Sequence, residues 1–198
     1  TGSVTYVVQR VESLMGLFYL LTLYGAIRGS EPASRTGWWT AAAIAACALG
    51  MMTKQVMVTA PILVWLWDRV FLEARPSHSS RRLLHLGLAA TWLILPFVAG
   101  VRRESVGFGF GWTWWSYLVT QAGVITHYLG LAIVPAPLVL DYGWPPARTL
   151  GEALPFVALL TVLVAATAIA LVRRRPVGFL GAWFFLILAP SSSILPIA

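Results

Sequence analysis

Residues 154–172 read LPFVALLTVLVAATAIALV, an apolar run that contains no charged side chain. A helix needs about 20 mainly apolar residues to cross the roughly 30 Å hydrocarbon core of a bilayer. The run comes close to that length, so we predict that residues 154–172 form a membrane-spanning helix. Its solvent would then be lipid rather than water.

The composition of the whole chain extends this prediction. The 198 residues are 59% hydrophobic and 11% charged, and they include ten tryptophans. Soluble globular chains are about 45–50% apolar and about 25% charged. A soluble enzyme, a nucleic-acid-binding domain and a disordered tail are therefore excluded, and we expect no nucleic acid among the partners. The net charge of +7 instead fits a loop bias of arginine in an integral, multi-pass membrane protein, whose partner is the lipid bilayer.

Seven apolar stretches define the expected fold. We predict an all-α, polytopic transmembrane helical bundle with about six spans and one re-entrant or interfacial helix. The six spans are Val11–Ile27, Trp38–Met52, Val56–Phe71, Leu83–Gly100, Leu154–Val172 and Val177–Ile194. The seventh stretch, Trp114–Val134, contains several polar residues, so its crossing has to be decided separately. We interpret residues 73–82 as an ordinary cytoplasmic connector.

Basic residues decide whether the seventh stretch crosses, because Lys and Arg prefer the cytoplasmic side. If it does not cross, the predicted inner side collects nine of the fourteen basic residues and the outer side five. If it crosses, the division is seven to seven. The inner nine are Arg28, Arg35, Arg69, Arg75, Arg81, Arg82, Arg173, Arg174 and Arg175, and the outer five are Arg10, Lys54, Arg102, Arg103 and Arg148. We therefore expect residues 101–152 to form an extracytoplasmic loop that contains an interfacial helix.

The ends of the chain and its rare residues suggest its origin. The chain begins without Met and stops soon after an apolar run, so we expect residues 1–198 to be a single membrane-domain fragment of a longer protein. Thirteen of the fourteen basic residues are Arg, a bias typical of a GC-rich bacterial genome, and the expected location is the bacterial inner membrane. Cys47 lies in an apolar stretch and is expected to be a small buried hydrophobe.

The predicted outer loop contains the residues with the strongest potential for binding. Glycines alternate with aromatic residues in 107–111, and further aromatic residues follow around Asp141 and Tyr142. One interpretation is an interfacial aromatic belt, and the other is a platform that grips an isoprenoid or stacks on a sugar. Asp141 either caps its own turn or, with Tyr142, holds sugar hydroxyls or a cation.

Polar residues on the predicted helix 114–134 are further candidates. Gln121 shares a face with Tyr117, Val124 and Tyr128, and His127 lies on an adjacent face. His127 is either a hydrogen-bonded structural group or a substrate contact. No second His stands at a metal-ligand spacing from it, so we expect no metal site and no cofactor within the fragment.

Charges beside the first three predicted spans complete the candidate set. Arg10 and Glu12 stand at the start of the first span, and Lys54 with Gln55 separates the second and third. A charge at the bilayer centre costs about 2.5–3.5 kcal/mol, so we place Lys54 in a tight turn at the interface. Arg10 and Lys54 either snorkel or pair with a substrate phosphate.

The order of these motifs resembles the transmembrane and tetratricopeptide-repeat O-mannosyltransferase-like family. The opening stretch 1–14 is similar to the segment that follows a His-Pro pair in that family, and Lys54-Gln55 is similar to its Lys-Glu. Residues 105–145 resemble its conserved central domain of unknown function, and residues 183–196 resemble the segment before its last spans. The resemblance covers essentially the whole chain.

This resemblance implies an integral-membrane glycosyltransferase of the GT-C type. Such an enzyme passes a sugar, mannose-like in this family, from a polyprenyl-phosphate donor to a protein or glycan acceptor on the extracytoplasmic face. It also implies a catalytic acid upstream of Thr1 and tetratricopeptide repeats downstream. The substrate-binding candidates are then Arg10, Glu12, Lys54, Gln121, His127, Asp141 and Tyr142.

Two residues depart from the family pattern and leave an alternative open. Gly2 and Gln55 each stand where the family has Glu. If either carboxylate is needed, the chain either uses another group in its place or is inactive. The alternative function is a non-catalytic membrane anchor that presents downstream repeats to protein partners. A transporter ranks below both readings, because the spans contain almost no ionisable residues along a midplane path.

Overall fold

A computed structural model of the protein describes residues 7–31, 35–72, 78–101, 114–134 and 150–192. Helices and short turns account for the described residues, and no strand occurs among them. The predicted all-α class is therefore confirmed. The chain divides into two compact units, Thr1–Arg103 and Glu104–Ala198, and each is described here by itself.

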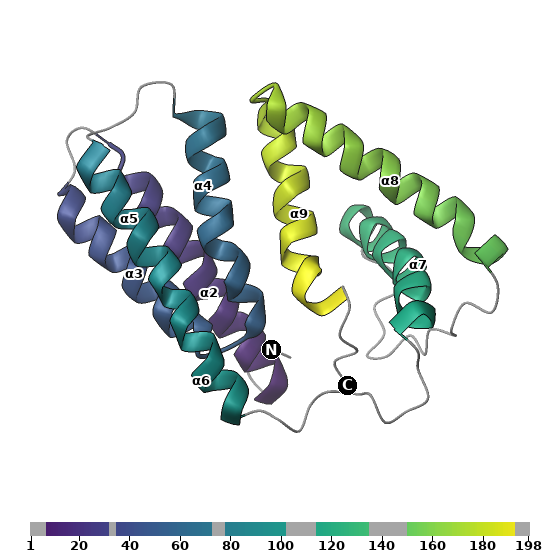
Figure 1. Ribbon diagram of the computed structural model, residues 1–198, viewed down its shortest axis with the longest axis horizontal. Coiled ribbons are helices and arrows are strands. Elements are labelled where there is room, and N and C mark those ends of the chain that lie inside the picture. Colours follow the sequence, from purple (N-terminus) through teal and green to yellow (C-terminus); the bar gives the residue numbers. More distant parts are fainter. Residues whose placement is uncertain (1–6, 32–34, 73–77, 102–113, 135–149, 193–198) are drawn as a thin grey trace. The chain divides into compact units, whose positions relative to one another are not determined.

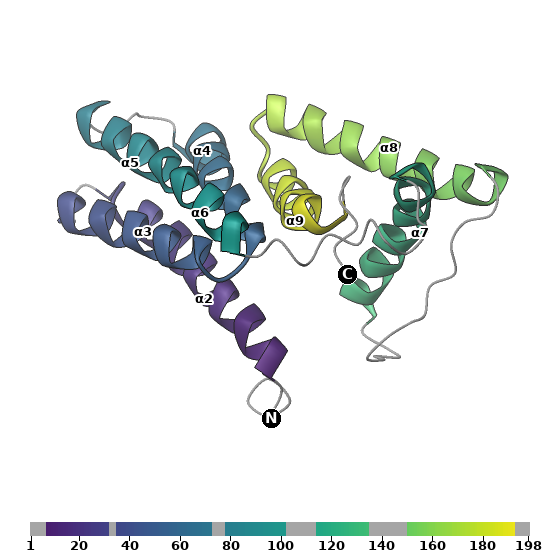
Figure 2. The ribbon, with the colours of Figure 1, turned by 60° about the horizontal axis from the view of Figure 1, so that its bottom comes forward.

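Unit 1 is a set of antiparallel helices. Its elements are α2 (Val7–Arg28), α3 (Thr36–Met51), the 3-10 turn η1 (Gln55–Thr59), α4 (Ala60–Phe71), α5 (His78–Ala90), the 3-10 turn η2 (Thr91–Leu93) and α6 (Ile94–Val101). Helices α2, α3, α4 and α5 run alternately in opposite directions (Figure 1). Helix α3 lies beside both α2 and α5 (Figure 2).

Small residues allow α2 and α3 to approach closely. A Cβ added at Gly25 would lie 3.1 Å from the Cβ of Ala43 and 3.2 Å from the carbonyl oxygen of Trp39. Two hydrogen bonds join other elements in this core: the hydroxyls of Tyr19 and Thr59 are 3.1 Å apart, and the Cys47 Sγ is 3.3 Å from the Thr91 Oγ1. Cys47 is fully buried, as the sequence predicts.

Unit 2 contains α7 (Trp114–Ile133), α8 (Leu150–Val172) and α9 (Pro176–Ser192). Helix α8 packs against both α7 and α9, and α8 and α9 form a hairpin (Figure 1). The end of α8 is a Schellman motif, because Arg175 N–H donates to Ala170 O and Arg174 N–H donates to Leu171 O. Arg174 therefore occupies the left-handed position of the motif, with φ 53°.

We expect Arg174→Gly to stabilise the α8–α9 hairpin by about 1 kcal/mol. A side chain in the left-handed region costs roughly 1–2 kcal/mol, and Gly adopts that region readily while losing more entropy on folding. Thermal unfolding of the purified protein in detergent measures the difference. Arg173→Gly, which removes the same charge from the last turn, is the control and is expected to lower stability. An equal change in both variants would contradict the prediction.

Most expected spans are observed as helices with different ends. The third becomes η1 followed by α4, and the fourth becomes α5, η2 and α6. Proline accounts for these breaks, because Pro61 lies at the start of α4 and Pro96 near the start of α6, where their missing N–H groups cost least. The interpretation of residues 73–82 as a connector is wrong for its second half, since α5 begins at His78.

Among the described residues, one helix is long and apolar enough to cross a membrane. It covers Ala153–Val172, whereas the apolar helices Thr36–Met51 and Pro176–Pro190 are shorter. At 1.5 Å per residue, Thr36–Met51 spans about 24 Å, less than the roughly 30 Å of a typical hydrocarbon core. The run quoted from the sequence is thus the helix with the clearest membrane-spanning character.

Candidate functional site

An ion pair joins two of the predicted site residues at one end of unit 1. The Lys54 Nζ donates a hydrogen bond to the Glu12 Oε1. Glu12 lies in the second turn of α2, and Lys54 is the extended residue that precedes η1. The tight turn predicted at Lys54 is confirmed, since the N–H groups of Thr53 and Lys54 both donate to Gly50 O.

The pair is accessible from outside. The side chains of Lys54 and Glu12 are 38% and 46% exposed, so an anionic ligand could reach the ammonium group without unfolding the turn. An ion pair exposed to this degree contributes at most about 1 kcal/mol to stability. Its effect is therefore local: the pair keeps the ammonium group of Lys54 beside the second turn of α2.

Arg10 lies on the same helix as Glu12 but on a different face. The sequence places Arg10 before the first span, whereas the structure includes it in α2, which begins at Val7. Two residues along a helix correspond to about 200° of rotation, so the Cβ atoms of Arg10 and Glu12 point to opposite sides. Gln55 begins η1 and is exposed. The structure thus brings Glu12 and Lys54 together, and it places Arg10 apart from them on α2.

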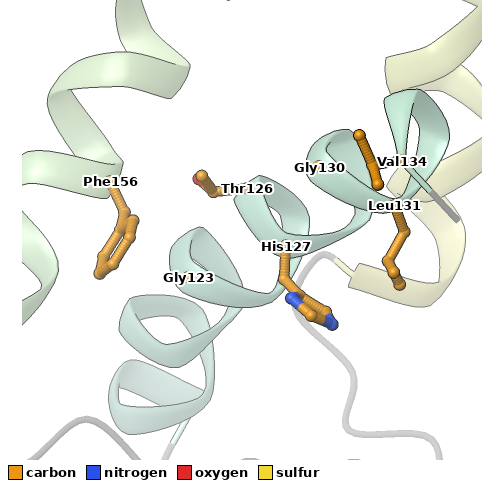
Figure 3. A pocket seen from close by; sticks show the side chains of 7 residues that line it. All are labelled: Gly123, Thr126, His127, Gly130, Leu131, Val134 and Phe156. Carbon is orange, nitrogen blue, oxygen red and sulfur yellow. The ribbon is translucent and has the colours of Figure 1, made fainter. Parts of the chain in front are cut away.

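A second candidate site lies in unit 2, where an open cavity of about 490 Å³ separates parts of α7 and α8. Phe156 of α8 lines it from one side, and His127 projects from α7 on a different side of that helix from Thr126 (Figure 3). The other lining residues are Gly123, Gly130, Leu131 and Val134. Gln121 is half-buried on α7 and is not part of the lining.

The cavity is lined mainly by apolar residues and glycines. The Thr126 hydroxyl donates to Ala122 O at 2.9 Å within α7. Among the described lining residues, His127 is the one with an ionisable side chain. A ligand for this cavity would therefore be mainly hydrocarbon, with at most one group that hydrogen-bonds to an imidazole. Gln121 and His127 are six residues apart, which corresponds to about 120° around α7. Their side chains therefore leave the helix in different directions.

Other predicted site residues fall outside the described ranges. Asp141, Tyr142 and the glycine–aromatic stretch 107–111 are among them. The stretch Trp114–Val134, predicted as an interfacial helix, is helical as α7 over Trp114–Ile133.

A polar cluster at the opposite end of unit 1 was not predicted. Arg81 of α5 donates from Nε to the Asp68 Oδ2 at 2.7 Å and pairs through a second nitrogen with Oδ1. The His85 Nε2 lies 2.8 Å from the same Oδ2, and Arg81 also donates to Ala26 O of α2 at 2.7 Å. Asp68 and Arg81 are largely buried, at 14% and 13% side-chain exposure. A carboxylate inside the apolar run of α4 is the signal that could have identified this cluster.

No group of three or more His, Cys, Asp or Glu side chains converges in the part of the chain that the structure describes. Comparison of the chain with protein-family models, curated proteins and solved structures gives no match. The candidate function therefore has to be argued from the residues themselves.

Proposed function

We propose that this chain is the membrane domain of a GT-C-type glycosyltransferase. It would transfer a mannose-like sugar from a polyprenyl-phosphate carrier to a protein or glycan on the outer face of a bacterial inner membrane. The proposal keeps the expected multi-pass arrangement, with α7 as the interfacial helix of the outer loop. The observation that supports it most is the Glu12–Lys54 pair, which positions a cation at one end of an apolar helical unit.

Exposed apolar surface supports the membrane part of the proposal. Most side chains of α8 between Leu154 and Val172 are exposed, and Leu154, Val162 and Val172 are each more than 60% exposed. A helix that is apolar all round has either a protein core or lipid as its surroundings. Lipid is the surrounding that matches this degree of exposure.

The distribution of charge in unit 1 supports a transmembrane orientation. Because its helices alternate in direction, the start of α2 and the turn between α3 and η1 lie toward one end of unit 1 (Figure 1). Arg10 belongs to the first of these segments and Lys54 to the second. The opposite end collects the basic residues Arg28, Arg35, Arg69, Arg81 and Arg82. An excess of arginine at one end is typical of the cytoplasmic side, which would leave Lys54 facing outward.

Lys54 would stabilise the leaving group of the reaction. Transfer of the sugar breaks the bond between its anomeric carbon and a phosphate oxygen, and negative charge develops on the polyprenyl phosphate. A fixed ammonium group beside that phosphate lowers the barrier because it is already oriented. Glu12 holds Lys54 at the turn before η1, whereas Arg10 points to the other side of α2. A carboxylate upstream of Thr1, implied by the family resemblance, would take the proton of the acceptor hydroxyl.

The apolar cavity of unit 2 fits a ligand that is mainly hydrocarbon. Its lining of Phe156, Leu131 and Val134 suits an isoprenoid chain, and His127 could hydrogen-bond to a polar group near the end of that chain. The cavity is therefore suited to a lipid chain and not to a soluble sugar nucleotide.

We expect Lys54→Gln to lower sugar transfer by about a hundredfold, the lower end of the range for losing one group that stabilises developing negative charge. The assay follows labelled sugar from a polyprenyl-phosphate donor, using the full-length protein in membranes. Glu31→Gln is a matched control, because Glu31 is also half of an exposed ion pair, with Arg28 at 2.6 Å. It lies at the other end of unit 1 and is expected to leave transfer within about twofold of the wild type.

Two results would count against this function. Equal transfer by Lys54→Gln and Glu31→Gln would remove Lys54 from the reaction. No transfer by the wild type, where a positive-control enzyme of the same type is active, would favour the non-catalytic membrane anchor.

A further inference from the structure

Two arginines beside the Asp68–Arg81–His85 cluster have no acidic partner among the described residues. Arg69 follows Asp68 on α4, Arg82 follows Arg81 on α5, and both side chains are exposed. The adjacent carboxylate of Asp68 already accepts hydrogen bonds from Arg81 and contacts His85. The positive charge of Arg69 and Arg82 is therefore not neutralised by this cluster.

Helical geometry places these two arginines on the same side of the α4–α5 hairpin. The hairpin is antiparallel, because Arg81 near the start of α5 meets Asp68 near the end of α4, while Trp92 after α5 donates to Val58 O before α4 at 3.0 Å. Viewed from one end, successive residues therefore rotate in opposite senses on the two helices. From a facing pair, one further residue on each helix rotates by about 100° toward the same side.

Apolar side chains continue from the arginines along the hairpin. Trp65 lies one turn before Arg69 and is 50% exposed, and the Arg69 guanidinium lies 5.7 Å from the centre of its ring. Leu86 lies one turn after Arg82 and is 69% exposed. Along the hairpin the two arginines come first, then the indole of Trp65 and the side chain of Leu86. This order matches the headgroups, the interface and the acyl chains of a bilayer.

We propose that Arg69 and Arg82 form a binding site for the headgroup of an anionic phospholipid, with an acyl chain along Trp65 and Leu86. A guanidinium group matches the geometry of a phosphate and binds it with two parallel hydrogen bonds. Arg81 contributes indirectly, because it neutralises Asp68, which would otherwise repel the phosphate. The inference rests on the proposed membrane insertion of unit 1 and does not depend on sugar transfer.

Native mass spectrometry tests this site directly. The full chain in non-ionic detergent is mixed with equal amounts of phosphatidylglycerol and phosphatidylcholine, and the retained lipids are counted. The wild type is expected to retain phosphatidylglycerol preferentially. Arg69→Gln/Arg82→Gln is expected to lower that affinity by about tenfold or more, given the contribution of each basic residue at an anionic surface.

Arg28→Gln/Arg35→Gln is the matched control, since it removes the same charge from the same end of unit 1. It is expected to lower phosphatidylglycerol binding by less than about threefold. Equal loss in the two double variants, or no preference for phosphatidylglycerol in the wild type, would overturn the site. Because no sugar donor is present, neither result bears on the glycosyltransferase proposal.

Salt dependence provides a test on the unaltered chain, should the glutamine variant fail to fold. Screening by salt weakens exposed charge interactions strongly between about 0.01 M and 1 M. Retention of phosphatidylglycerol by the wild type is expected to fall about tenfold or more over that range. Retention that does not change with salt would contradict a headgroup site made of two exposed arginines.

Discussion

Asp68→Ala is expected to lower the free energy of unfolding of unit 1 by about 3–5 kcal/mol, the range for removing one partner of a buried ion pair. The carboxylate of Asp68 accepts hydrogen bonds from two nitrogens of Arg81 and contacts His85. Arg81 is only 13% exposed, and its guanidinium cannot lose its proton. The variant would therefore leave a largely buried positive charge without its partner.

Cys47 reports this unfolding without any added label site. It is the single cysteine of the chain, it is fully buried, and its Sγ contacts Thr91, the first residue of η2, which directly follows α5. Opening of α5 therefore exposes the thiol. The measurement is the rate of thiol labelling as a denaturing detergent is added, and the midpoint is expected at a markedly lower concentration in Asp68→Ala.

Two further variants separate the loss of the ion pair from other effects. Asp68→Ala/Arg81→Met removes both charges and is expected to recover much of the lost stability, because replacing a whole buried pair by apolar groups is often nearly neutral. Glu31→Gln breaks an exposed pair and is expected to cost less than about 1 kcal/mol. If Asp68→Ala is no less stable than Glu31→Gln, the cluster does not hold α4, α5 and α2 together.

The helical class and most helix positions were predictable because long apolar runs impose them. Val11–Ile27 and Leu154–Val172 lie inside α2 and α8, and each helix extends by a few residues beyond the apolar part. Polar helical turns such as His78–Arg82 were not predictable from apolarity, since their helical form depends on tertiary partners. Arg81 in that turn is held by Asp68, thirteen residues earlier.

The candidate site was predictable residue by residue but not as a set of contacts. Lys54 and Glu12 were each identified as charges beside apolar runs, yet their pairing depends on where α2 meets the turn before η1. Asp68 lies inside the predicted span Val56–Phe71, and no helical spacing in the sequence relates it to Arg81. A carboxylate near the end of one apolar run and an arginine near the start of the next run form a pattern that predicts such an ion pair.

The α8–α9 hairpin depends on two glycines in a way that no charge pattern reveals. A Cβ on Gly178 would lie 2.5 Å from the Leu171 nitrogen and 2.7 Å from the Ala170 carbonyl carbon. One turn later, a Cβ on Gly181 would lie 2.5 Å from the Thr167 Oγ1. Small residues at helix interfaces let backbones approach closely in membrane proteins. At Gly178 the obstacle is backbone, which cannot rotate away as the Thr167 side chain can.

We therefore expect Gly178→Val to destabilise the hairpin by about 3 kcal/mol, the upper part of the range for an overpacked interface. The reporter is a cysteine at the buried position 182, introduced as Ala182→Cys together with Cys47→Ala, and its labelling midpoint is expected at a lower denaturing-detergent concentration. Gly16→Val is the control, since a Cβ on Gly16 of α2 has no atom within 4 Å. Equal labelling midpoints in the two variants would show that α8 and α9 do not require a glycine at 178.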